Sequence, residues 1–264
     1  MTDQRTSFPL NVIRRLGAGA LDGVQEAGRM LLFLLSALLC LFTHVPKVGR
    51  FVRRVQFIGF QSLLVVALAG AFTGMVLGYQ GYRTLSRFGS TAMLGPLVGL
   101  SLLKELGPVL TALMVTGRAG SALAAELGIM RIGEEIDALE VMGLSPHQHL
   151  VVPTLLAGAI CLPLLTAVFN VLGILGGYLV GVKLLGVGGG VYLGEMAAYV
   201  EMRDVLEGVW KALCFGGFIT WICCFKGYTA RFGAEGVSRA TTQAVVISSV
   251  VILVWDYFMT SVFF

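Results

Sequence analysis

The sequence contains little charge. Of its 264 residues, 13% are charged and 56% are hydrophobic, whereas roughly a quarter of an average soluble domain is charged. This composition excludes an ordinary soluble fold and predicts an integral membrane protein. The net charge of +4 does not indicate nucleic-acid binding, because the basic residues lie at the borders of apolar runs rather than in one soluble patch.

The sequence also lacks the motifs by which many enzymes bind nucleotides and metals. GxxxxGK[ST], HExxH and GxSxG do not occur, and the five cysteines do not have zinc-ligand spacing. We therefore expect no catalysis by this chain, and no cofactor or metal bound to it. The cysteines, all in apolar surroundings, are interpreted as buried thiols. The first thirty residues lack a short apolar run with a cleavage site, so they do not form a secretory signal.

Long apolar runs predict membrane spans. We expect five of them, at Phe57 to Gln80, Met93 to Thr116, within Leu150 to Val182, Val205 to Phe225 and Ala240 to Phe264. The basic N-terminal region predicts a cytoplasmic N-terminus by the positive-inside rule, and five spans then place the C-terminus outside. A small cluster, Arg83 and Arg87, does not follow this rule.

The N-terminal 56 residues are predicted to stay near one membrane surface. Residues 1–29 have the pattern of an interfacial amphipathic helix. The apolar run Met30 to Phe42 has thirteen residues, short of the roughly twenty needed to span, so we expect it to dip into the bilayer or lie obliquely. The chain thus divides into an interfacial and elbow region, 1–56, and a transmembrane domain, 57–264.

Glycine and proline predict how the spans pack. Two runs with glycine at every fourth position, Gly70-Gly74-Gly78 and Gly173-Gly177-Gly181, are typical of helices whose backbones approach closely. Pro96 and Pro108 predict a kink or a partly unwound segment in the second span. The predicted fold class is therefore an all-α integral membrane protein with about five transmembrane helices.

The longest charged stretch between two spans covers residues 117–149. Within it, Ile132, Ile136 and Leu139 recur at three-to-four-residue spacing, which predicts a short amphipathic helix outside the bilayer. Gly143 would end this helix. Its acidic side chains are either a solvated face or part of a surface that docks into a groove of a soluble partner.

Lys104 and Glu105 are adjacent charges within the second predicted span. A charge at mid-bilayer costs about 2.5 to 3.5 kcal/mol on insertion scales, so it normally faces a partner or a wet cavity. Neighbours on a helix point about 100° apart, so the two cannot readily neutralise each other. Either each pairs with another helix, or one lines the entrance of a cavity for a ligand with a charged head and apolar tails. For Asp256 and Asn170, an interhelical hydrogen bond is expected.

Three stretches of sequence resemble a known family. GLSLLKELGPVLTALMVTGRAGSALAAELGIMRIGEEIDALEVMGLSP, GAFTGMVLGYQGY and GAEGVSRATTQAVV are similar to the signature of the MlaE permease family. These are membrane subunits of bacterial ABC transporters that move phospholipids between the inner and outer membranes and maintain outer-membrane lipid asymmetry. The likeness extends from about residue 50 onward.

The resemblance implies a homodimer in the inner membrane of a double-membraned bacterium. Two ATPase subunits, which bind ATP and Mg²⁺, would contact the cytoplasmic coupling helix at about residues 131–143, with a STAS-domain protein on the ATPase. A hexamer of MCE-domain proteins would lie on the periplasmic face. By similarity, the coupling residues are Arg131, Glu134, Glu135, Asp137, Leu139, Glu140 and Met142, and the phospholipid cavity residues are Leu77, Leu85, Phe88, Lys104 and Glu105. Lys104 departs from the arginine expected in many relatives, and it offers a point charge instead of a planar fork for phosphate.

Two other functional classes remain as alternatives. An ion-coupled carrier for an amphipathic substrate would use Lys104, Glu105 and Asp256 as its ionisable relay. The scarcity of charges within the spans and the absence of a visible internal repeat argue against it. A membrane scaffold for the periplasmic ring would transport nothing, and it would leave the ATPase rate of the partner unchanged.

Overall fold

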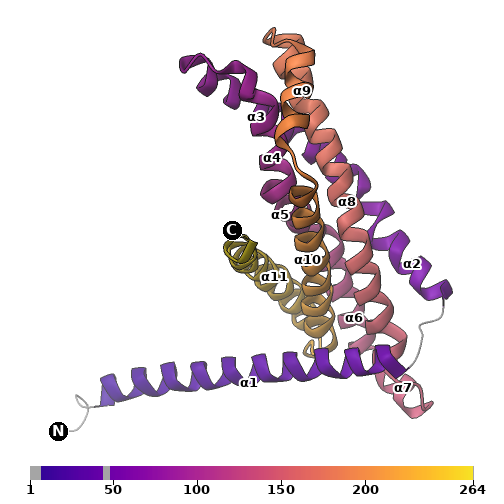
Figure 1. Ribbon diagram of the computed structural model, residues 1–264. Coiled ribbons are helices and arrows are strands. Elements are labelled where there is room, and N and C mark those ends of the chain that lie inside the picture. The colour runs from indigo at the N-terminus through magenta and orange to yellow at the C-terminus, as the bar shows by residue number, and fades with distance from the viewer. Residues whose placement is uncertain (1–6, 44–47, 264) are drawn as a thin grey trace.

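The apolar runs fold into long helices that pack side by side (Figure 1). The computed structural model describes residues 7–43 and 48–263, and within these residues every regular element is helical. Residues 1–6, 44–47 and 264 lie outside the described residues. They include the start of the predicted interfacial helix and the last residue of the predicted fifth span.

The chain order is as follows. The α-helices are α1 (Ser7–Thr43), α2 (Val48–Ile58), α3 (Leu63–Arg87), α4 (Leu94–Ser101), α5 (Gly107–Val115), α6 (Ser121–Ile132), α7 (Glu135–Val141), α8 (Val152–Tyr178), α9 (Gly189–Tyr199), α10 (Met202–Tyr228) and α11 (Ala234–Phe263). Short 3₁₀ turns precede α3 and α4, η1 (Phe60–Ser62) and η2 (Thr91–Met93). The turns η3 (Leu102–Leu106), η4 (Thr116–Gly120), η5 (His147–Val151) and η6 (Leu179–Leu184) are π-helical.

Six helical stretches in the described part of the chain are long and apolar enough to cross a membrane. They are Gly23–Leu41, Val48–Arg87, Thr91–Ile132, His147–Leu184, Met202–Tyr228 and Ala234–Val262. The last five correspond to the five predicted spans. The first belongs to α1, in which residues 7–43 form one continuous helix instead of an amphipathic segment followed by a separate short element. Figure 1 shows α1 running across one end of the bundle, not along it.

Glycine determines the closest contact in the bundle, between α3 and α8. A Cβ atom on Gly74 would lie 1.8 Å from the carbonyl oxygen of Gly173, and one on Gly70 would lie 2.6 Å from that of Phe169. A Cβ on Gly78 would approach the oxygen of Gly177 to 3.0 Å. The two predicted glycine runs therefore face each other, and the missing side chains allow the backbones to touch.

The helix of the second span is longer than the sequence predicted. It continues from Thr91 to Ile132, so residues 117–132 extend this helix past its predicted end at Thr116 and pack on α10 and α11. Their charges did not end the helix because other helices satisfy them. Arg118 donates to the carbonyl oxygen of Phe57 and lies 5.0 Å from its ring, and Glu126 accepts two hydrogen bonds from Arg54, at 2.6 and 3.0 Å.

Pro108 leaves the second span helical but widens one turn of it. Proline lacks an N–H group and its ring clashes with the carbonyl four residues earlier, here that of Lys104. The chain adapts through the π-turn η3, directly before Pro108. This turn carries both Lys104 and Glu105, so the predicted disturbance occurs at the charged pair. In α8, by contrast, the helix runs through Pro163.

The two ends of the bundle differ. Figure 1 shows α7 near α1 at one end and α9 at the other. Helix α9 packs on α4 through Tyr192, which is fully buried. Burial raises the pKa of Tyr192 to about 12, so its hydroxyl remains protonated and donates to the carbonyl oxygen of Ile174 at 3.4 Å.

Candidate functional site

Charged and polar side chains from three membrane helices meet beside the widened turn η3. We call this group the charged cluster. It consists of Lys104 and Glu105 of η3, Asp204, Glu207 and Lys211 of α10, and Asp256 and Thr260 of α11. Each contact in it joins different helices, so side chains of neighbouring helices satisfy the charges that the sequence placed within spans.

Lys104 forms ion pairs with the start of α10. Its Nζ lies 2.8 Å from Asp204 and 3.9 Å from Glu207. A capping box holds Asp204 in place, since its carboxylate accepts a hydrogen bond from the backbone N–H of Glu201 at 3.0 Å. The lysine side chain keeps 36% of its surface exposed while Asp204 keeps 10%. Lys104 is therefore the accessible member of this pair.

The second half of the cluster centres on Lys211, whose side chain is 3% exposed. Its Nζ lies 3.0 Å from Asp256 and donates to Thr260 at 2.7 Å. Thr260 in turn donates to Glu105 at 3.4 Å. Glu105 is exposed, so it borders the cluster while Lys211 is enclosed. Asp256 thus makes an interhelical contact, as expected, and the contact is an ion pair.

The apolar residues of the predicted cavity lie on or after α3. Leu77 and Leu85 are partly buried and pack against the core. Phe88 follows α3 and is 78% exposed. The five predicted cavity residues therefore occupy two places: three along α3 and its end, and two in the charged cluster between α10 and α11.

Helix α7 is shorter than the predicted coupling helix at 131–143. It begins after Glu134, which has a left-handed backbone with φ 57°, and it ends at Val141. Arg131 belongs to the last turn of α6. The sharp turn at Gly133 and Glu134 separates the two helices, and this backbone geometry is not visible in the periodic pattern of apolar residues.

The buried and exposed side chains of α7 differ from those that the sequence predicted. Ile136 is completely buried against the rest of the chain, and Leu139 is half-buried, so these side chains anchor α7. The surface left open carries acids and two apolar side chains at the C-terminal end: Glu134, Glu135, Glu140, Val141 and Met142 are exposed.

Contacts of charged residues also hold α7 in place. Arg131 pairs with Asp137 and lies 5.7 Å from the ring centre of Tyr228. Tyr228 donates to Glu140 at 3.1 Å. Arg131 and Asp137 thus connect α7 to α6, and they position the helix within the chain.

Comparison with known proteins agrees with this architecture. The family model described as Permease MlaE matches residues 51–262, which is most of the chain. The chain belongs to the MlaE permease family. The matched region includes the charged cluster and α7, and leaves out α1.

Individual MlaE relatives extend the similarity to nearly the whole chain. The Haemophilus influenzae protein named "Intermembrane phospholipid transport system permease protein MlaE" is 42% identical over 259 residues, 97% of this chain and 98% of that protein. A "Probable ABC transporter permease protein" of Rickettsia bellii is 41% identical over 255 residues, with the same coverage. A chloroplastic protein of Arabidopsis thaliana, TRIGALACTOSYLDIACYLGLYCEROL 1, is 35% identical over 206 residues, 78% of this chain and 59% of that protein.

The MlaE fold brings together several charged residues that were not expected from the sequence. Lys211, Asp204 and Glu207 were not selected, although Lys211 lies inside a predicted span. A lysine within an otherwise apolar run was the available signal. The ion pairs of Lys104 with Asp204 and Glu207 could not be recognised in this way, because these residues are far apart in the sequence.

Proposed function

We propose that this chain is the permease subunit of an ABC transporter that moves phospholipids between the inner and outer membranes. The name of the Haemophilus influenzae relative, an intermembrane phospholipid transport permease, supports this substrate class. The charged cluster supports it from the structure. Glu105 is exposed and Lys104 is partly exposed at the surface of apolar helices, and charges in that position require a wet cavity or a protein partner to cover them.

In this proposal, two copies of the chain cover the cluster and enclose the lipid. The acyl chains contact Leu77, Leu85 and Phe88, while Lys104 and Glu105 face the polar head group. The pairing of Lys104 with Asp204 and Glu207 holds its ammonium group at the cavity border. Lys104 provides one compact charge to a phosphate, in contrast to the two-pronged contact of an arginine.

ATP and Mg²⁺ belong to a partner ATPase, which docks on α7. The exposed acids Glu134, Glu135 and Glu140 provide the charge of this docking surface, and Val141 and Met142 provide its apolar part. The other proposed partners are a STAS-domain protein on the ATPase and an MCE-domain hexamer on the opposite face. The chain lies in the bacterial inner membrane with its N-terminus in the cytoplasm and its C-terminus in the periplasm.

The carrier alternative has less support. It needs Lys104 and Asp256 to exchange ions freely, yet each is held by an oppositely charged partner, Asp204 and Lys211 respectively. Transport by the purified chain alone under an ion gradient would favour that alternative.

Reversal of charge on α7 tests the proposal. The variant Glu134→Lys/Glu135→Lys should abolish co-purification of the ATPase with the chain, because two acids of the docking surface become basic. It should also fail to restore the outer-membrane barrier in cells that lack the gene. Glu195→Lys on α9, at the other end of the bundle, is the control for ATPase binding and should co-purify with the ATPase as the wild type does. Normal ATPase binding by the double variant would refute docking at α7.

Native mass spectrometry of the wild-type complex tests the substrate and the assembly. The expected species contains two copies of this chain, two ATPase subunits and retained phospholipid. A dimer with ATPase but without phospholipid would contradict the substrate class and leave the docking assignment intact.

A further inference from the structure

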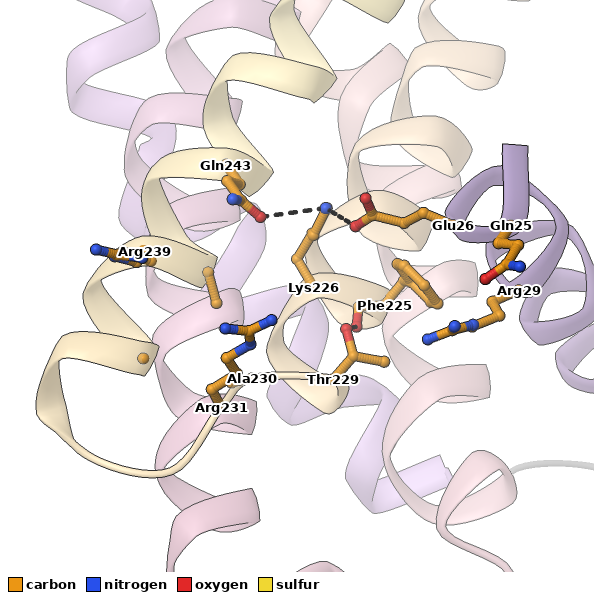
Figure 2. A pocket seen from close by; sticks show the side chains of 12 residues that line it. Gln25, Glu26, Arg29, Phe225, Lys226, Thr229, Ala230, Arg231, Arg239 and Gln243 are labelled. Carbon is orange, nitrogen blue, oxygen red and sulfur yellow. Dashed lines mark hydrogen bonds and ion pairs between the residues drawn. The ribbon is translucent and has the colours of Figure 1, made fainter. Parts of the chain in front are cut away.

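A basic pocket lies at the α1 end of the bundle, away from the charged cluster. It has a volume of about 540 Å³, within the usual range of small-ligand sites. Residues of α1, the end of α10, the following turn and the start of α11 line it (Figure 2). Four of its lining side chains are basic and one is acidic: Arg29, Lys226, Arg231 and Arg239 against Glu26.

Lys226 forms the neutralised part of the pocket. It is 4% exposed, pairs with Glu26 of α1 and donates to Gln243 of α11 at 3.3 Å. It thus connects three helices, and a second tie lies nearby, where Trp221 donates to the carbonyl oxygen of Met30 at 3.0 Å. These contacts fix α1 against the bundle and define the pocket walls.

Apart from the Lys226–Glu26 pair, Arg29 and Arg231 supply positive charge to the pocket. Figure 2 shows them on opposite sides of Thr229, Arg29 on the α1 side and Arg231 on the α11 side, and both line the pocket. Among the residues whose side chains the structure describes, 21, 23–41 and 48–262, neither arginine forms an ion pair. Two unpaired guanidinium groups that face one cavity are suited to an anion with several oxygen atoms, such as a phosphate.

The backbone turn that carries Arg231 is sterically fixed. Gly233 has φ +96°, a conformation that favours glycine. A Cβ atom on Gly236 would lie 2.1 Å from the carbonyl oxygen of Arg231. The α10–α11 turn therefore closes tightly on itself and presents Arg231 at a defined place on the pocket rim.

An apolar surface continues from the pocket along α11. Val246, Val250 and Leu253 follow Gln243 at intervals of three and four residues, so they share its helix face. Each of the three is more than half exposed. On α1, Leu31 and Leu32 lie two and three positions after Arg29 and are also exposed. A ligand held by the pocket would therefore have apolar surface available for attached hydrocarbon chains.

We propose that this pocket binds the phosphate of an anionic phospholipid from the leaflet on the α7 side of the membrane. Basic pockets between transmembrane helices are a common arrangement for such head groups. The site is separate from the transport cavity and does not depend on the transport activity proposed above. Arg29 and Arg231 hold the phosphate, while the exposed face of α11 contacts the acyl chains.

The test measures phosphatidylglycerol binding to the full-length chain in detergent by native mass spectrometry. Arg29→Gln/Arg231→Gln removes the two unpaired charges and leaves the Lys226–Glu26 pair intact. The apparent dissociation constant of this variant for phosphatidylglycerol should be at least about tenfold higher than that of the wild type. Arg50→Gln/Arg53→Gln on α2 removes the same charge elsewhere on the chain and should leave the dissociation constant unchanged. Arg231→Gln alone serves if the double variant is not monodisperse, and should show a smaller rise.

Competition distinguishes a lipid from free phosphate. Inorganic phosphate at millimolar concentration should not displace phosphatidylglycerol, because it gains nothing from the apolar face of α11. Displacement by inorganic phosphate would assign the site to free phosphate and overturn the lipid proposal. Equal lipid binding by the pocket variant and the α2 control would overturn it as well. If Arg29→Gln/Arg231→Gln loses ATPase co-purification but binds phosphatidylglycerol as the wild type does, the pocket is a protein contact. This result would also contradict the proposal.

Discussion

At the scale of single residues, ion pairs explain how this apolar bundle contains charge. Lys211 is enclosed by protein, and Asp256 lies 3.0 Å from it on the neighbouring helix. Removal of one partner from a buried pair leaves the other uncompensated, at a cost of about 3 to 5 kcal/mol. Lys211→Met should therefore lower the melting temperature of the purified protein strongly.

Removal of both charges should reverse most of this loss. An apolar pair in place of a buried ion pair is often neutral in stability, so Lys211→Met/Asp256→Leu should melt at a higher temperature than Lys211→Met alone. Lys183→Met is the control, since Lys183 is exposed on η6, and it should melt like the wild type. A double variant as unstable as the sum of its two single variants would show that the pair is not coupled.

In the charged cluster, one residue of each ion pair could be recognised from the sequence. Lys104 and Asp256 were selected because a charge in an apolar run is costly, which is a local property of the sequence. Their partners Asp204 and Lys211 were not, because pairing across helices depends on how the spans are placed beside each other. The free charges of Arg29 and Arg231 become significant only when α1 folds back to α10.

At the scale of helices, glycine decides which spans touch. Gly74→Ala would place a methyl group 1.8 Å from the carbonyl oxygen of Gly173, far inside van der Waals contact, so α3 and α8 would have to separate. We expect a large fall in the yield of monodisperse protein and a lower melting temperature. Size-exclusion chromatography in detergent and thermal unfolding measure both effects.

Gly217→Ala on α10 is the matched control, because a Cβ atom at that position meets nothing within 4 Å. Alanine also has the higher helix propensity, so this variant should be at least as stable as the wild type. Equal stability of Gly74→Ala and Gly217→Ala would show that the α3–α8 contact has room for a side chain.

The sequence predicted the helices better than their ends. Periodic glycine and long apolar runs indicated the spans and the contact between α3 and α8. The second span was expected to end at Thr116 because Arg118 and Glu126 are charged, but its helix continues to Ile132. Both charges are satisfied by α2 and the segment that follows it, and a contact so distant in the sequence has no local pattern. For the same reason, the apolar pattern that includes Ile136 did not show that this side chain is buried in its own chain.

At the scale of the whole molecule, the proposed mechanism needs one orientation in the membrane. The α7 end must face the cytoplasm, where ATP is available, and α9 must face the periplasm. Basic residues support this direction: Arg131 pairs with Asp137 of α7, while Arg29, Arg231 and Arg239 line the pocket beside α1, and cytoplasmic ends carry an excess of arginine and lysine. Arg83 and Arg87 at the opposite end are too few to reverse this asymmetry.

Cysteine labelling in cells tests this orientation. In a background without the five native cysteines, Met142→Cys and Tyr199→Cys place single thiols at opposite ends of the bundle, at positions 65% and 49% exposed in the wild-type chain. A maleimide that cannot cross the inner membrane should label Tyr199→Cys once the outer membrane is permeabilised. It should label Met142→Cys only after the inner membrane is opened. Reversed labelling would place α7 on the side without ATP, and the coupling of this chain to a cytoplasmic ATPase would then be impossible.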